Sequence, residues 1–436
     1  MTFSTTPNSA RCVRSGGDVG TLLFVVATDE DQEGGWSACR VLSAGRLSAS
    51  TIECMDLPTD IITSGASEVV SASTKAHGHS YGGLRHAHAG EDAPVALGAW
   101  RGPRREEREE AESSILAPGA TRAVGSGKRL VFEEPDARRT CFERDLDRIK
   151  YSHPFRRLVG KCQVFLAPDD VHIRSRMTHA IEVAQVSLSI ANAVGLNPAL
   201  CEAIALGHDC GHGPGGHASE DAFASYVEGG FDHAKWGADV MLAPLNLCEE
   251  TLDGIRQHSW RLAPAKTPEG LATSWADRLA YLTHDADDAI RQGIITPADL
   301  PSDVREIFGL RQSEQIRNMI TIIVGAIERT GQIGMPEEAA RALDSFRSFN
   351  YERIYLRSEA IEQNNKVIAM LSALVEFYAK EPWHIPAVHN GEFECANYTE
   401  SLAVSVKYVS GMTDRFAVTQ AQRHLSWRED LTPRSV

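Results

Sequence analysis

The sequence predicts an all-α protein, in which a helical bundle is followed by additional C-terminal helices and preceded by a poorly structured extension. Beyond Arg139, long segments carry apolar residues with a helical period and are separated by Gly, Pro and Asn, while alternating apolar and polar stretches are few. Residues 1–100 differ, because Ser, Thr, Gly and Ala dominate there, Lys75 is the only lysine, and no helical period persists. We therefore predict a flexible extension over 1–100, a charged linker over 101–140, a helical core over 141–300 and a C-terminal helical region over 301–436.

Composition excludes several classes of protein. The chain has 44 Lys and Arg against 59 Asp and Glu, a formal net charge of −15, and no dense basic block, which argues against nucleic-acid binding by counterion release. The strongly apolar run near the N-terminus, Leu22 to Ala27, is far too short to span a bilayer. Nine cysteines without a CxxC pair, and an N-terminus without a secretory pattern, predict a cytoplasmic protein with reduced thiols.

The first elements follow in order along the chain. The run RGPRREEREEAE, residues 101–112, suits an exposed helix or a linker. A helix is predicted from near Thr178, and one of its stripes is formed by His179, Val183, Val186 and Ile190. The next helix has Asn197 as its N-cap and Pro198 at its first position, and runs to Gly207.

Polar residues that can carry chemistry follow directly. The segment GHDCGHGPGGHASEDAF, residues 207–223, places an imidazole and a carboxylate side by side at a helix end, followed by His212, His217 and Glu220. Farther on, WADRLAYLTHDADDAI predicts a helix with an acidic inner stripe, formed by Asp277, Tyr281, Asp285 and Asp288. Each pattern is weak alone, because a histidine on an apolar stripe is usually a core residue and an acidic stripe is usually solvated.

Together these residues predict a metal site. Two imidazoles and two carboxylates are available from His179, His208, Asp209 and Asp277. This mixed nitrogen and oxygen set suits a divalent Mn, Fe, Co, Ni or Zn ion and leaves coordination positions open for water and substrate.

At these residues the sequence resembles the HD-domain superfamily and, within it, the dGTPase-like deoxynucleoside triphosphate triphosphohydrolases. The family pattern H…HD…D matches the four predicted ligands. Further similar blocks are FERDLDRIKYSHPFRRLVGKCQVF (142–165), RSRMTHAIEVAQ (174–185) and GMTDRFA (411–417). Two departures are Gly215, which stands where the family has an aromatic residue, and Lys407, which replaces an acidic one. We expect the first to widen or loosen the pocket rim.

The resemblance implies roles for the charged residues. It places Arg176 and Arg278 at the substrate phosphates, whereas Arg156 and Arg157 would contact phosphate or pack subunits; Lys161 adds positive charge. His217, oriented by Glu220, would protonate the leaving 5′-oxygen, although the reversed role of base toward water stays open.

It also implies contacts to the rest of the substrate. His212 and His233 resemble further phosphate-binding histidines, with ordinary buried histidines as the alternative. Tyr281 and Asp285 would pack and hydrogen-bond the deoxyribose, or else act only in helix packing and capping. Gln163 would lie near the nucleoside, or else have a polar helix-cap or surface role.

The expected enzyme is therefore a dNTP triphosphohydrolase that converts dGTP or several dNTPs to deoxynucleoside and inorganic triphosphate. The expected cofactor is one of the divalent ions above, and Mg can accompany the triphosphate. The resemblance further implies a homo-oligomer. The alternatives are another HD-domain phosphohydrolase, such as a 5′-nucleotidase or cyclic-nucleotide phosphodiesterase, and a nucleotide sensor without turnover.

Overall fold

The computed structural model describes residues 97–166 and 170–432, together with five short strands earlier in the chain. The chain divides into two units, residues 1–100 and residues 101–436. In the first unit, β1 (Arg11–Val13), β2 (Leu23–Val25) and β3 (Val41–Ser43) form an antiparallel sheet, and β4 (Ser80–Tyr81) pairs with β5 (Leu84–Arg85). The rest of the predicted flexible extension, apart from residues 97–100, lies outside the described residues.

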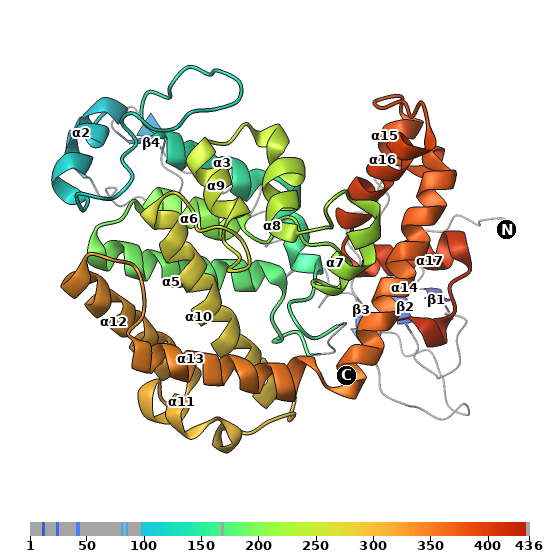
Figure 1. The fold of residues 1–436 in the computed structure, drawn as a ribbon. Coiled ribbons are helices and arrows are strands. Elements are labelled where there is room, and N and C mark those ends of the chain that lie inside the picture. The colour runs from blue at the N-terminus through green and yellow to red at the C-terminus, as the bar shows by residue number, and fades with distance from the viewer. Residues whose placement is uncertain are drawn as a thin grey trace. The chain divides into compact units, whose positions relative to one another are not determined.

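The second unit is helical, as the sequence predicts (Figure 1). Its α-helices are α2 (Arg105–Ile115), α3 (Cys141–Tyr151), α4 (His153–Arg157), α5 (Arg176–Val194), α6 (Pro198–Gly207), α7 (Ala218–Phe223), α8 (His233–Trp236), α9 (Glu249–Arg256), α10 (Pro268–Arg291), α11 (Ser302–Ile307), α12 (Gln312–Thr330), α13 (Glu337–Asn350), α14 (Ser358–Lys380), α15 (Pro386–His389), α16 (Tyr398–Ser410) and α17 (Asp414–Leu425). Short 3₁₀ and π segments are η1 (Leu158–Gly160), η2 (Ala224–Tyr226), η3 (Gly237–Met241), η4 (Ala243–Leu245), η5 (Pro297–Asp299), η6 (Tyr351–Tyr355), η7 (Pro382–His384) and η8 (Glu429–Leu431).

Helices α5, α6 and α10 pack against one another at the centre of the larger apolar core. Their starts are set by local sequence, since the side chains of Ser175, Asn197 and Thr267 each accept a hydrogen bond from a backbone N–H of the first turn. Proline at the first position of α6 and α10 costs no helical hydrogen bond. The predicted second helix is confirmed at both ends, and α5 begins at Arg176, two residues before its predicted start.

A second apolar core lies among α7, α14, α16 and α17 (Figure 1). It contains fully buried Tyr378 and Leu371 of α14 and Val409 of α16. The loop between α6 and α7, which carries the histidine-rich motif, therefore runs from the larger core to this smaller one.

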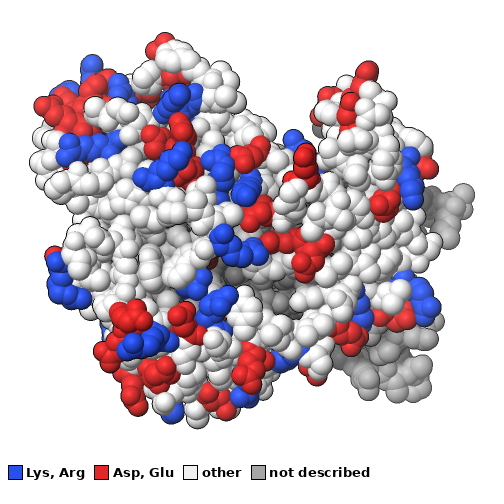
Figure 2. Space-filling view, viewed as in Figure 1, with Lys and Arg blue, Asp and Glu red and all other residues white. Residues whose placement is uncertain are grey.

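The structure also bears on membrane spans, on the distribution of surface charge and on two of the cysteines. None of their helices is both long and apolar enough to cross a membrane. On the face shown in Figure 2, acidic and basic side chains are interspersed rather than gathered in one basic patch. Cys201 and Cys210 are free thiols that are fully buried in the larger core, where they act as small apolar side chains.

Candidate functional site

The four predicted metal ligands come together from three helices. His179 lies in the first turns of α5, His208 and Asp209 follow the end of α6, and Asp277 lies in the middle of α10. Nε2 of His179 is 3.0 Å from Oδ1 of Asp277, and Nε2 of His208 is 3.6 Å from the same oxygen. Oδ1 of Asp209 is 3.4 Å from Nε2 of His208. The donor atoms of His179, His208 and Asp277 lie within 4.8 Å of one another, and those of His208, Asp209 and His258 form a second such group. The four predicted ligands therefore gather around His208, which both groups share.

This donor set fits a divalent metal ion. Nδ1 of His208 donates to the backbone oxygen of Ala205 over 2.6 Å, which leaves Nε2 with its lone pair exposed to the cluster. That Nε2 is buried and has no hydrogen-bond partner among the described residues. A buried imidazole nitrogen without a partner is costly, and a metal ion among two carboxylates would satisfy it.

The carboxylates of the cluster are held in their ionised form. Burial alone would raise the pKa of Asp209, but His208, Arg176 and His212 hold it well below the usual value. Burial likewise acts against Asp277, but the hydrogen bond with His179, together with the charges of His208, His179 and His258, outweighs burial and lowers the pKa of Asp277. Arg176, itself buried, donates from Nη1 to Oδ2 of Asp209 over 2.8 Å and so orients that carboxylate.

A second cluster contains the four predicted catalytic residues. Oε1 of Glu220 accepts from Nδ1 of His217 at 3.0 Å and from Nδ1 of His233 at 2.7 Å. The His212 ring stacks on the His233 ring with centroids 3.7 Å apart, and its Nε2 lies 3.4 Å from Oδ1 of Asp209. The His217 side chain is 73% exposed, whereas His212 and His233 are buried. His212 thus connects the two clusters, and His217 faces solvent.

His258 is a member of the site that the sequence reasoning missed. It follows α9, its Nδ1 donates to the backbone oxygen of Ile255 at 2.8 Å, and its Nε2 lies 3.1 Å from Nε2 of His233. Burial, and then the charges of His208 and His233, lower the pKa of His258 to about 4, so its Nε2 accepts. The Nε2 of His233 is therefore the donor in the contact between the two rings. The sequence feature that could have indicated His258 is its position directly after a helix end, which it shares with His208 and Asp209.

On α10, the predicted phosphate and sugar residues line one side of the helix. The guanidinium carbon of Arg278 lies 3.5 Å from the centroid of the Trp260 ring, a cation–π contact that fixes its direction. Tyr281 is half-buried, and burial raises its pKa to about 12. The sequence reasoning did not find Arg347, which lies 4.6 Å from the centroid of Tyr351 and acts electrostatically on Tyr281.

Asp285 is a buried carboxyl group with an incomplete set of partners. Its Oδ2 accepts from the Tyr355 hydroxyl at 2.6 Å, and its Oδ1 has no hydrogen-bond partner among the described residues. Burial raises the pKa of Asp285 to about 7, although the Tyr355 hydrogen bond opposes this. Tyr355, in η6, is a further partner that no spacing in the sequence indicated. Asp288, one turn on, instead pairs with Arg174 and lies outside the ligand cluster.

Three polar residues of the 142–165 block differ in burial and in hydrogen-bond partners. Gln163 is half-buried; its backbone oxygen lies 3.4 Å from Nη2 of Arg176, and its Oε1 has no hydrogen-bond partner among the described residues. Lys161 is not a phosphate-facing cation as expected, because its buried Nζ donates to the backbone oxygens of His212 and Ser410. Arg157 is exposed beside α16 and α17.

The glycine that replaces an aromatic residue does not open the rim in the expected way. Gly215 has a φ of +71°, and a Cβ there would lie 2.5 Å from Cγ1 of Val367 in α14. Its N–H donates to Oδ1 of Asp414 at 2.9 Å. The loop backbone therefore packs directly against α14, and Val367 occupies the space next to Gly215.

Comparisons with known proteins agree with this geometry. Residues 176–282 match the HD domain, and residues 333–423 match the phosphohydrolase-associated domain. The first match includes all four predicted metal ligands, and the second spans most of the helices that form the smaller core.

Similar proteins extend the match over most of the chain. A deoxyguanosinetriphosphate triphosphohydrolase-like protein of Caldanaerobacter subterraneus is 37% identical over 320 residues, which cover 72% of this chain and 93% of that protein. One from Desulfatibacillum aliphaticivorans is 36% identical over 340 residues, 73% of this chain and 97% of that protein. A solved phosphohydrolase structure from Bacteroides thetaiotaomicron aligns with a TM-score of 0.41 at 18% identity, over 65% of this chain and 68% of that chain. On the two sequence matches, this chain belongs to the deoxyguanosinetriphosphate triphosphohydrolase-like family of HD-domain phosphohydrolases.

Proposed function

We propose that this protein hydrolyses deoxynucleoside triphosphates, dGTP or several dNTPs, to a deoxynucleoside and inorganic triphosphate in a metal-dependent reaction. The observation that carries the proposal is the position of Nε2 of His208, which lies near His179 and Asp277 in one group and near Asp209 in a second, and has no hydrogen-bond partner among the described residues. The names of the relatives supply the substrate class.

Those four side chains would hold the ion, with Arg176 keeping the Asp209 carboxylate in place. A bound Mn, Fe, Co, Ni or Zn ion would act as a Lewis acid on a phosphate oxygen and activate water, and Mg can accompany the triphosphate. The chain itself adds positive charge for the triphosphate through Arg278, which is stacked on Trp260. His233 is assigned as a further phosphate-binding residue.

His217 is the proton donor in this proposal. Its Nδ1 is held by Glu220, which leaves Nε2 free on an exposed ring that a bound substrate can approach. Departure of the 5′-oxygen requires a proton, and Nε2 of His217 delivers it as that bond breaks. Glu220 also accepts from His233 and contacts Arg261 at 3.1 Å, so it orients the proton donor rather than accepting its proton.

The deoxyribose is assigned to Tyr281 and Asp285. Oδ1 of Asp285, which is buried and has no hydrogen-bond partner among the described residues, would bind a sugar hydroxyl. The Tyr281 ring would pack against the sugar face where a 2′-hydroxyl would project. Gln163 is assigned to the nucleoside. We also propose, from the family resemblance, homo-oligomeric assembly and a cytoplasmic location.

The test is incubation of the metal-loaded protein with each dNTP and each rNTP, in Mn²⁺ or Mg²⁺, with chromatographic separation of products. Inorganic triphosphate together with deoxynucleoside supports the proposal. Release of single phosphates, or cleavage of a monophosphate or cyclic nucleotide alone, would instead identify a different HD-domain phosphohydrolase.

A further inference from the structure

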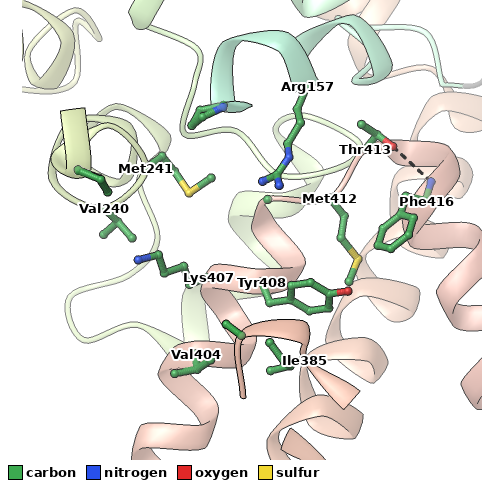
Figure 3. A pocket seen from close by; sticks show the side chains of 14 residues that line it. Arg157, Val240, Met241, Ile385, Val404, Lys407, Tyr408, Met412, Thr413 and Phe416 are labelled. Carbon is green, nitrogen blue, oxygen red and sulfur yellow. Dashed lines mark hydrogen bonds between the residues drawn. The ribbon is translucent and has the colours of Figure 1, made fainter. Parts of the chain in front are cut away.

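The structure contains a pocket separate from the metal cluster (Figure 3). Its lining residues come from α4, from η3, from the start of α15 with the residue before it, from α16 and from the start of α17. Its volume is ≈ 530 Å³, within the range of about 300–1,000 Å³ that is common for small-molecule sites. Most of the lining is apolar, and its larger side chains are Met241, Ile385, Tyr408, Met412 and Phe416. A space of this size with an apolar wall can bury most of a small ligand.

Two cations enter this pocket from different elements. Arg157, at the end of α4, and Lys407, in α16, both line it, as Figure 3 shows. Neither has an ion pair or a side-chain hydrogen bond among the described residues. The guanidinium of Arg157 lies against the backbone of Gly411, where a Cβ would come within 2.9 Å of its Nη1. Because the chain carries a net charge of −15, two unpaired cations in one pocket stand out against the acidic remainder.

We propose that this pocket binds a small anionic ligand with an aromatic or aliphatic body. The apolar wall would bury the body of the ligand, while the positive charges of Arg157 and Lys407 would attract its anionic group. A neutral ligand would leave both cations unpaired, and a small inorganic anion would leave the apolar wall in contact with water.

The floor of the pocket is the segment that also anchors the candidate active-site loop. Gly411, Met412 and Thr413 line the pocket, and the residues on either side of them reach toward the site. On one side, the backbone oxygen of Ser410 accepts from Nζ of Lys161 at 3.0 Å, and the same Nζ donates to the backbone oxygen of His212.

On the other side, Asp414 connects two loops. Its Oδ1 accepts from the N–H of Gly215 at 2.9 Å, two residues before His217, and its Oδ2 accepts from the N–H of Cys162 at 2.8 Å, next to Gln163. A ligand that orders residues 411–413 therefore also restrains the loops that carry His217 and Gln163. We expect binding in the pocket to reduce the mobility of these two loops.

The binding test uses 1-anilinonaphthalene-8-sulfonate, an aromatic anion whose fluorescence rises in apolar surroundings, and the uncharged N-phenyl-1-naphthylamine, which has the same ring system. Titrations are made on the full chain and on Arg157→Glu, Lys407→Glu and Arg156→Glu. The last is the matched control, because Arg156 is an exposed cation of the same helix that does not line the pocket. Thermal melting confirms that each variant folds, as expected for changes at exposed side chains.

We expect each charge reversal in the pocket to weaken sulfonate binding at least tenfold, because it removes a charge-assisted contact and adds repulsion. Arg156→Glu should change the Kd by less than threefold, and the neutral probe should bind at least tenfold more weakly than the sulfonate. Equal binding of the two probes, or equal weakening by all three variants, would overturn the proposal.

The coupling is read by hydrogen–deuterium exchange rather than by activity, so its outcome does not depend on the proposed hydrolysis. Saturating sulfonate should slow exchange in peptides that cover residues 158–165 and 207–217 in the wild type but not in Lys407→Glu. Unchanged exchange in both peptides at saturation would show that the pocket and the loops are not coupled.

Discussion

Replacement of Asp285 by Asn tests whether the pKa of this buried carboxyl group in α10 is raised to about 7. The carboxyl is 3% exposed, one of its oxygens has no hydrogen-bond partner among the described residues, and its pKa is raised from 3.8 to about 7, with burial as the main cause. The folded protein therefore holds a proton at Asp285 over a pH range in which the unfolded chain has lost it. Asn keeps the acceptor for the Tyr355 hydroxyl and removes the titration.

The sign follows from proton linkage. Between about pH 4 and pH 7 the folded state binds more protons than the unfolded state at this group, so the free energy of unfolding falls as pH rises and levels off above pH 7. At about 1.4 kcal/mol for each unit of pKa difference, the fall between pH 5 and pH 8 amounts to about 2 to 3 kcal/mol. The stabilising contribution of the protonated group is complete only below about pH 4.

The assay is urea unfolding of the metal-free protein, in a chelating buffer, at half-unit steps from pH 5 to pH 8. We take the difference in the free energy of unfolding between Asp285→Asn and wild type at pH 5 as the reference value. By pH 8 this difference should shift by about 2 to 3 kcal/mol in favour of the variant. The control Asp287→Asn removes a partly exposed carboxylate of the same helix and should not reproduce this change, because it leaves the Asp285 carboxyl group in place. Tyr355→Phe, which removes the hydrogen bond that opposes the shift, should extend the fall beyond pH 7. Parallel profiles for Asp285→Asn and wild type would refute the reasoning.

Three other changes give distinct expected outcomes. His217→Ala should lower kcat by about 10² to 10⁴ and leave the metal content and melting temperature unchanged, because the ring is 73% exposed and lies outside the ligand set; turnover within threefold of wild type would exclude the acid role. Gly216→Ala should lower both the melting temperature and the metal affinity, since φ is +61° and its Cβ would meet the guanidinium of Arg176. Gly230→Ala, with φ +86° and open space around it, is the control and should lower only the melting temperature. If calorimetry gave the same metal affinity for Gly216→Ala and Gly230→Ala, the steric argument would be contradicted. Deletion of residues 1–100 should leave the melting temperature within a few degrees of wild type, because they form a separate unit, and an insoluble product would show that they support the helical core.

The sequence by itself determined the local features of this protein. The N-cap and proline of α6, the stripe that contains His179 and the adjacent pair of His208 and Asp209 are patterns over a few residues, and a helical period is enough to predict them. The prediction of the metal ligands therefore rests on the spacing of residues together with the family resemblance. The acidic stripe of α10 was predicted in the same way, but the period alone did not separate Asp277, which faces the ligand cluster, from Asp288, which pairs with Arg174.

Only the tertiary structure decided which distant segments meet these residues. Lys161 reaches the backbone of Ser410, 249 residues away, and Tyr355 reaches Asp285 across 70 residues. His258 joins His233 because the end of α9 packs against α8. A helical period determines which face of a helix is buried, but it carries no information about which other helix covers that face, because apolar burial is non-directional and many partners would satisfy it equally. The partners of buried polar groups, and with them the protonation of Asp285, are set by that packing.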